Sequence, residues 1–109
     1  MIRLSTDFWV AAYLARLDAI GVPAHLVSKG DATAGAVIVK GATMDGQASA
    51  FARETGPDGG RIWAPLAELG PEADVDEKLE RQLRFDPDLW IIEVEDPKGR
   101  SLLDEDGLS

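Results

Sequence analysis

Acidic side chains are concentrated near the C-terminus, in the stretch RFDPDLWIIEVED of residues 84–96. It carries five carboxylates, those of Asp86, Asp88, Glu93, Glu95 and Asp96. Carboxylates can hold Mg²⁺ or Ca²⁺, or serve as the acid and base of a glycosidase. They can also have a purely structural role, in which they join a helix to a strand.

A metal-dependent nuclease would need two carboxylates and a lysine around Mg²⁺. The order Pro87-Asp88, then Asp96-Pro97-Lys98, imitates that pattern. However, Asp96 and Lys98 fall in a predicted type I turn rather than on a strand. The chain also has 11 basic and 20 acidic residues. Its net charge of −9 disfavours a nucleic-acid substrate.

The two other carboxylate chemistries have less support. Residues 104–107, with the sequence DEDG, begin like a calcium loop, but the bidentate glutamate that closes such a loop does not follow. A glycosidase needs two carboxyl groups about 5 to 10 Å apart, and nothing in the sequence distinguishes two of the 20 acids. An enzyme that uses the carboxylates of residues 86–96 is therefore the least favoured functional class.

The structural role explains the stretch most simply. A proline ends the preceding helix, and Asp86 and Asp88 can accept hydrogen bonds from N–H groups of the turn that follows. Trp90 then anchors a strand in the core. Glu93 and Glu95 lie on the opposite face of that strand, where they face solvent or a basic residue of the next strand.

Other residues form no recognised catalytic or metal-binding motif. His25 is the single histidine and cysteine is absent, which removes thiolate chemistry and the usual zinc ligand sets. The segment Gly30–Gly35 lacks the Gly-Lys-Ser/Thr sequence of a phosphate-binding loop. We therefore predict no catalytic residue, no cofactor and no metal.

Two helices and about five strands are predicted to position these residues. N-cap residues and an apolar stripe at helical spacing predict a helix over residues 5–20. Pro71 and charges ordered along the helix dipole predict a second helix over residues 71–85. Strands are predicted at residues 24–29, 35–41, 47–54, 61–66 and 89–95, with a short return at residues 100–103.

This order of elements indicates an α+β domain. We expect an N-terminal helix, an antiparallel sheet of about five strands and a second helix before the last long strand, with both helices on one face. Ala48, Ala50 and Ala52 alternate along one strand and predict a helix packed closely against them. The domain is expected to span residues 1–103, followed by a frayed acidic tail at residues 104–109.

The first helix is apolar nearly all round. Its main stripe contains Val10, Tyr13, Leu14 and Leu17. Phe8 and Trp9 are predicted to lie off this stripe. Adjacent residues on a helix are about 100° apart, so Phe8 and Val10 point about 200° apart. Phe51 and Trp63 are predicted on a sheet face that the helices leave open. These four aromatic residues are the candidate interface. The candidate polar surface site consists of Asp86, Asp88, Glu93 and Glu95.

A non-enzymatic interaction module is the leading functional hypothesis. It would bind a protein partner, or a second copy of itself as a homodimer, through the candidate interface. The alternative is a small-ligand-binding or regulatory domain.

Nucleic acid and membrane are not expected as partners. The basic residues are scattered singly, so no basic patch is visible in the sequence. The longest apolar run, Phe8–Ala15, is far shorter than the roughly 18 residues of a membrane span. The lack of cysteine and of a signal peptide predicts a cytoplasmic protein.

Three segments together resemble one bacterial family. They are FWVAAYLAR (8–16), KGDATAGAVIVK (29–40) and RFDPDLWIIEVED (84–96). In this order they are similar to the domain of unknown function 1491 family, found mainly in alphaproteobacteria. The resemblance spans most of the chain, with residues 42–70 matching least. It implies a small stand-alone cytoplasmic protein. It implies no activity and no catalytic residue, because the family has none assigned.

Overall fold

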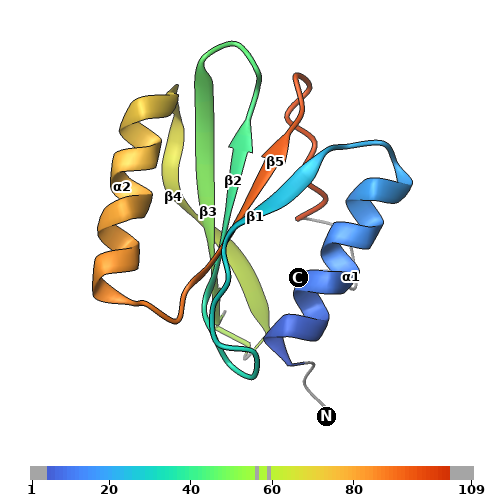
Figure 1. Cartoon of the computed structure of the whole chain (residues 1–109), viewed down its shortest axis with the longest axis vertical. Helices are drawn as coiled ribbons and strands as arrows, with labels where there is room; N and C mark the ends of the chain where they lie inside the picture. Colours follow the sequence, from blue (N-terminus) through green and yellow to red (C-terminus); the bar gives the residue numbers. More distant parts are fainter. Residues whose placement is uncertain (1–4, 56, 59, 104–109) are drawn as a thin grey trace.

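The structure, a computed structural model, describes residues 5–55, 57–58 and 60–103 of the 109-residue chain (Figure 1). The predicted tail at residues 104–109 lies outside the described residues. Two helices and five strands follow in the order α1 (Thr6–Ala19), β1 (Ala24–Ser28), β2 (Val37–Ala42), β3 (Gln47–Thr55), β4 (Arg61–Pro71), α2 (Glu72–Phe85) and β5 (Trp90–Glu95). Neither helix is long and apolar enough to cross a membrane.

The five strands form one sheet in the order β1-β5-β2-β3-β4. The last strand is therefore inserted between the first and the second. Neighbouring strands are antiparallel, except that β2 and β5 are parallel. The α+β class and the five main strands are confirmed, whereas the expectation of an entirely antiparallel sheet is wrong. The expected return at residues 100–103 is not a strand.

The two central strands bury apolar side chains on both of their faces. On β2, Val37 and Val39 belong to one apolar cluster and Ile38 to another. On β5, Ile92 lies in the first cluster and Ile91 in the second, and all five side chains are at most 3% exposed. Because a strand points alternate side chains to opposite faces, the sheet has a core on each side.

Each core is closed by one helix, so α1 and α2 lie on opposite faces of the sheet (Figure 1). Tyr13 and Leu17 of α1 pack into the first cluster, and Val75 and Leu79 of α2 pack into the second. The expectation that both helices cover one face is therefore wrong. A single covered face would have left half of the apolar side chains of β2 and β5 in water.

The alanine-lined face of β3 lies under α2, as predicted. Ala48 and Ala50 are fully buried in the second cluster with Val75 and Leu79, and Ala52 packs against that cluster. Small side chains allow the helix axis to approach the strand closely.

Neither helix covers the whole sheet. Helix α1 packs beside β1, whereas α2 packs against β3 and β4. The α1 face is therefore only partly covered over β3 and β4, where Trp9 of α1 reaches Trp63, and the α2 face is open over β1 and the end of β5 that carries Glu95. Phe51 and Trp63 lie on the first of these open areas, and His25 lies on the second.

Trp90 ties the loop between β1 and β2 to the centre of the sheet. Its side chain is 2% exposed, and its Nε1 donates a hydrogen bond to the Asp31 carbonyl at 2.7 Å. Gly30 and Gly35 approach Trp90 so closely that a Cβ at either position would overlap its ring. The carbonyls of Ala32 and Thr33 accept hydrogen bonds from the first N–H groups of α1. These glycines therefore serve close packing, as expected for a segment that lacks the phosphate-loop sequence.

We expect Trp90→Ala to lower the free energy of unfolding by about 3 to 5 kcal/mol, because the change removes a buried aromatic ring from the centre of the core. Trp90→Phe is the matched control, since it keeps a ring but removes the hydrogen bond to Asp31. Urea denaturation of the three proteins measures both effects. A loss below about 1 kcal/mol for Trp90→Ala would contradict the burial described above.

Candidate functional site

The predicted polar surface site is divided between two structural roles. Asp86 and Asp88 lie in the turn between α2 and β5, where the Asp86 carboxylate accepts a hydrogen bond from the Asp88 N–H at 3.1 Å. The Asp88 carbonyl accepts a hydrogen bond from the Asp31 N–H at 2.9 Å. The structural role predicted for Asp86 is therefore confirmed, and Asp88 contributes through its backbone.

Glu93 is one of three carboxylates around the buried Lys40. The Lys40 side chain is 4% exposed, and its Nζ lies 2.9 Å from a carboxylate oxygen of Glu93 on the neighbouring strand. The same ammonium contacts Glu72 at 2.7 Å and Asp76 at 2.6 Å, both near the start of α2. These four residues are called the Lys40 cluster below. Glu93 was predicted to face either solvent or a basic residue of the next strand. The second alternative is confirmed, because Glu93 contacts Lys40.

The Lys40 cluster fixes the start of α2 against the two central strands. Burial lowers the pKa of Lys40, but hydrogen bonds to Asp76, Glu72 and Glu93 outweigh that effect and hold it above its ordinary value. A buried ammonium without these partners would be strongly unfavourable. Sequence reasoning missed the role of Lys40, although a single lysine at the end of the apolar run VIVK was the available signal.

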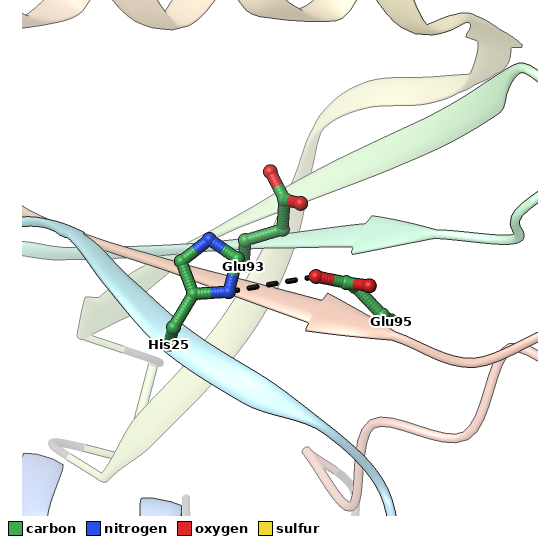
Figure 2. Close-up of side chains that lie close together, drawn as sticks. All are labelled: His25, Glu93 and Glu95. Carbon is green, nitrogen blue, oxygen red and sulfur yellow. Dashed lines mark ion pairs between the residues drawn. The ribbon is translucent and has the colours of Figure 1, made fainter.

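Glu95 lies beside His25 on the open part of the α2 face. His25 Nδ1 is 3.5 Å from a Glu95 carboxylate oxygen (Figure 2). Ligand atoms of His25, Glu93 and Glu95 lie within 4.8 Å of one another, which is the spacing of a metal-binding group. However, Glu93 is already bound by the Lys40 ammonium, which repels a second cation. The His25 side chain is also 54% exposed, so water competes freely for any ion there.

A divalent metal is therefore not expected to stabilise the protein. Adding millimolar Mg²⁺ or Ca²⁺, or micromolar Zn²⁺, at constant ionic strength should leave the melting temperature unchanged, because a bound ion would raise it by mass action. Glu95→Gln is the matched variant, since it removes one ligand without changing the shape of the side chain. A rise of several degrees that Glu95→Gln abolishes would show that His25, Glu93 and Glu95 hold a metal.

The opposite open area contains a pocket of about 690 Å³ on the α1 face, between β4 and the segment of residues 98–103. It is called the basic pocket below. Its apolar lining consists of Phe51, Ile62, Trp63, Leu102 and Leu103. Its basic lining consists of Arg61, Lys98 and Arg100. Phe51 and Trp63 of the candidate interface thus lie in one hollow, where they adjoin cations rather than an exposed apolar surface.

The other two candidate interface residues lie in different environments. Trp9 is 4% exposed, its ring stacks on Tyr13 at a centroid distance of 4.9 Å, and the ring of Trp63 lies 5.6 Å away. The prediction that Trp9 lies off the buried stripe is wrong, because β4 supplies a second surface that encloses it. Phe8 is 60% exposed and does not join this group. The structure therefore brings together Trp9, Phe51 and Trp63, without Phe8.

Arg53 is not among the lining residues of the basic pocket, but it lies beside Trp63, which is, and it was not predicted as a functional residue. It is the antiparallel partner of Trp63, and its guanidinium lies 4.9 Å from the centroid of the Trp9 ring. Burial, together with the positive charge of Arg61, lowers the pKa of Arg53 to about 10. The guanidinium is charged at neutral pH, but it is poorly hydrated.

Two buried donors at this position have no acceptor among the described residues. They are Nη1 of Arg53 and Nε1 of Trp63. The large majority of buried side-chain polar atoms in native proteins have a hydrogen-bond partner. Because Arg53 and Trp63 are opposite each other on paired strands, the two donors belong to neighbouring side chains.

Asp96 holds the other wall of the basic pocket in place. Its carboxylate accepts hydrogen bonds from the N–H groups of Lys98 at 3.2 Å and Arg100 at 2.8 Å, and from the Arg100 guanidinium at 2.8 Å. The Arg100 side chain holds the pKa of Asp96 at about 2, although burial opposes it. The Tyr13 hydroxyl donates to the Ser101 carbonyl at 2.7 Å. The segment is thus fixed at two points, and the charge of Arg100 is compensated by Asp96.

Comparison with known proteins identifies the family. The model of the family described as "Protein of unknown function (DUF1491)" matches residues 4–104. The search of curated proteins found no match. A crystal structure of a DUF1491 family protein from Caulobacter crescentus CB15 is 44% identical, with a TM-score of 0.86 over 93% of this chain and 95% of that one.

Two structures determined in solution agree with this result. An NMR structure of a DUF1491 family protein from Caulobacter crescentus CB15 is 43% identical, with a TM-score of 0.84 over 94% of each chain. A protein from A. tumefaciens is 27% identical, with a TM-score of 0.79 over 94% of this chain and 93% of that one. The resemblance drawn from three sequence segments is therefore confirmed. The chain belongs to the DUF1491 family, a family of unknown function.

Proposed function

We propose that the protein is a binding module without enzymatic activity, and that it holds a ligand with an anionic group in the basic pocket. The supporting observation is the pair of buried donors, Arg53 Nη1 and Trp63 Nε1, for which the described residues offer no acceptor. Leaving a buried donor unsatisfied costs about 1 to 3 kcal/mol. Both atoms have almost no solvent exposure, so oxygen atoms of an acidic ligand would reach and satisfy them after a movement of the Trp63 or Arg53 side chain.

The distribution of charge supports the same ligand chemistry. The chain has 11 basic residues against 20 acidic ones. Even so, Arg53, Arg61 and Lys98 lie at or beside one pocket, and none of them forms an ion pair with another described residue. Like charges in a partly buried site repel one another unless an anion joins them. The positive potential of the pocket would also attract an anion to a protein that is acidic overall.

The chemistry of the lining supports recognition rather than catalysis. The described residues that line the basic pocket include no carboxylate, imidazole or thiol. A general acid or base at neutral pH is usually one of these groups. Asp96, which lies outside the lining, is held by Arg100 and by two backbone N–H groups. The alternative of a small-ligand-binding domain therefore fits this site better than an enzyme does.

The expected outcome is thermal stabilisation by small anions. Millimolar benzoate, octanoate or inorganic phosphate, compared with chloride at equal ionic strength, should raise the melting temperature by several degrees for those that bind. Trp63→Phe keeps the ring but removes one unpaired donor, so its response should be clearly smaller. Arg84→Gln, which removes an exposed charge from α2, is the control for general electrostatic effects. No stabilisation by any anion, or an unchanged response in Trp63→Phe, would contradict the proposal.

Association through α1 is a second candidate function. The observation that favours it is Phe8, which is 60% exposed on α1 directly beside the buried Trp9. Exposed aromatic residues of this kind are frequent in protein interfaces. A second copy of the chain is the proposed partner.

Light scattering after size exclusion tests this second candidate. The wild type should have the mass of a dimer at micromolar concentration, and Phe8→Glu should have the mass of a folded monomer. Ala73→Glu adds the same charge at an exposed position of α2, on the opposite face of the sheet, and should leave the dimer intact. A monomeric wild type, or a Phe8→Glu protein that is still dimeric, would rule out an interface at Phe8.

A further inference from the structure

We infer that the ligand of the basic pocket is an amphipathic monocarboxylate, meaning one carboxylate joined to an apolar ring or chain. This inference rests on the proposed function, because it specifies which anion the pocket holds. It distinguishes that ligand from bare inorganic anions and from nucleotides or other polyphosphates.

The size of the pocket is the first argument. Its volume of about 690 Å³ is within the range of small-molecule sites, which measure roughly 300 to 1,000 Å³. Acetate or phosphate, each with only a few heavy atoms, would fill a small fraction of it. A ligand that fills the pocket must therefore have a body attached to its acidic group.

The lining shows that this body is apolar. Four lining side chains are apolar or aromatic, whereas Ile62 points its side chain to the opposite face of β4. Phe51 and Trp63 provide ring faces on one wall, and Leu102 and Leu103 provide aliphatic surface on the other. Covering this surface with an apolar ligand is favourable because it removes hydrocarbon from water.

The buried donors fit a single carboxylate. Arg53 and Trp63 are directly paired across β3 and β4, so their side chains start about 4.5 to 5.5 Å apart. Together they offer two N–H groups, one charged and one neutral. A carboxylate has two oxygens and one negative charge, which matches this pair in number and in charge.

The charge available is too small for a polyphosphate. Arg100 is already compensated by Asp96 at 2.8 Å, which leaves Arg61 and Lys98 as the cations of the lining without a described ion-pair partner. Four phosphate charges would exceed these two cations and Arg53 together, and would also meet the net charge of −9. Arg61 and Lys98 instead suit the attraction of a monoanion toward the buried donors.

Isothermal titration calorimetry of the full-length protein tests the inference with matched pairs of ligands. The probes are indole-3-acetate and octanoate, their neutral amides, and acetate and phosphate as bare anions. One or both amphipathic acids should bind, with the corresponding amide roughly tenfold weaker or more and with no measurable heat from acetate or phosphate. Comparing indole-3-acetate with octanoate shows whether the pocket prefers an aromatic or an aliphatic body.

Two variants assign the binding to the pocket. Trp63→Phe should weaken the acid several-fold and the amide less, because the hydrogen bond from the indole N–H to a charged carboxylate oxygen is stronger than one to an amide carbonyl. Leu102→Asp should weaken both amphipathic ligands, since it places a charge in the apolar lining. Leu102 is half-buried, so this variant is expected to fold, and circular dichroism verifies that it does.

The possible failures can be told apart. If acetate or phosphate binds as tightly as the amphipathic acids, and Trp63→Phe weakens that binding, the amphipathic inference is wrong and the proposed anion-binding function stands. If acid and amide bind equally, the pocket recognises an apolar body alone, and the carboxylate inference is wrong. If no probe binds to the folded wild type, both the inference and the proposed function are overturned.

Discussion

The fold depends on one constraint, which is that the two central strands are apolar on both faces. β2 and β5 lie side by side and parallel, and their alternating side chains feed two separate cores. Each core needs a cover, because hydrocarbon left in water is unfavourable. One helix per face is the arrangement that two helices can provide. The chain connects β2 to β5 through β3, β4 and α2. This connection places α2 on the face of the sheet opposite α1.

The same constraint creates the open areas in which the candidate sites lie. A helix is about 10 Å wide, and strands are about 4.8 Å apart, so one helix covers two or three of the five strands. α1 covers the β1 side of one face and α2 covers the β3–β4 side of the other. The uncovered parts are thus diagonally opposite, and their charges differ. One contains Arg53, Arg61 and Lys98 beside aromatic rings, and the other contains His25 and Glu95 beside the Lys40 cluster.

Much of the local structure could be predicted from the sequence, because the signals are local. The VIV run of β2, the alternating alanines of β3 and the helix dipole charges of α2 each identified an element with nearly correct bounds. The strand order could not be predicted, because the insertion of β5 between β1 and β2 is a long-range choice. The apolar runs of β2 and β5 do imply burial on both faces. Burial on both faces of these strands disagrees with the expectation that both helices cover one face.

The candidate site was harder to predict than the fold. Arg53, Arg61 and Lys98 are isolated charges in the sequence, and only strand pairing and the turn after β5 bring them together. Trp9 was assigned to the surface because a helical pattern does not reveal that a later strand encloses the helix. By contrast, the pairing of Glu93 with a basic residue on the next strand followed from the alternation of side chains along β5.

We propose that the buried donors of Arg53 and Trp63 receive the carboxylate of a ligand. The most direct measurement is the indole N–H signal of each tryptophan in ¹⁵N NMR spectra during titration with an amphipathic acid. The account predicts that the Trp63 signal moves strongly and that its hydrogen exchange with water slows. The Trp90 signal should stay in place, because its N–H is bonded to Asp31 at 2.7 Å. A Trp63 signal that does not move at saturation, or that moves no more than the Trp90 signal, would contradict the account.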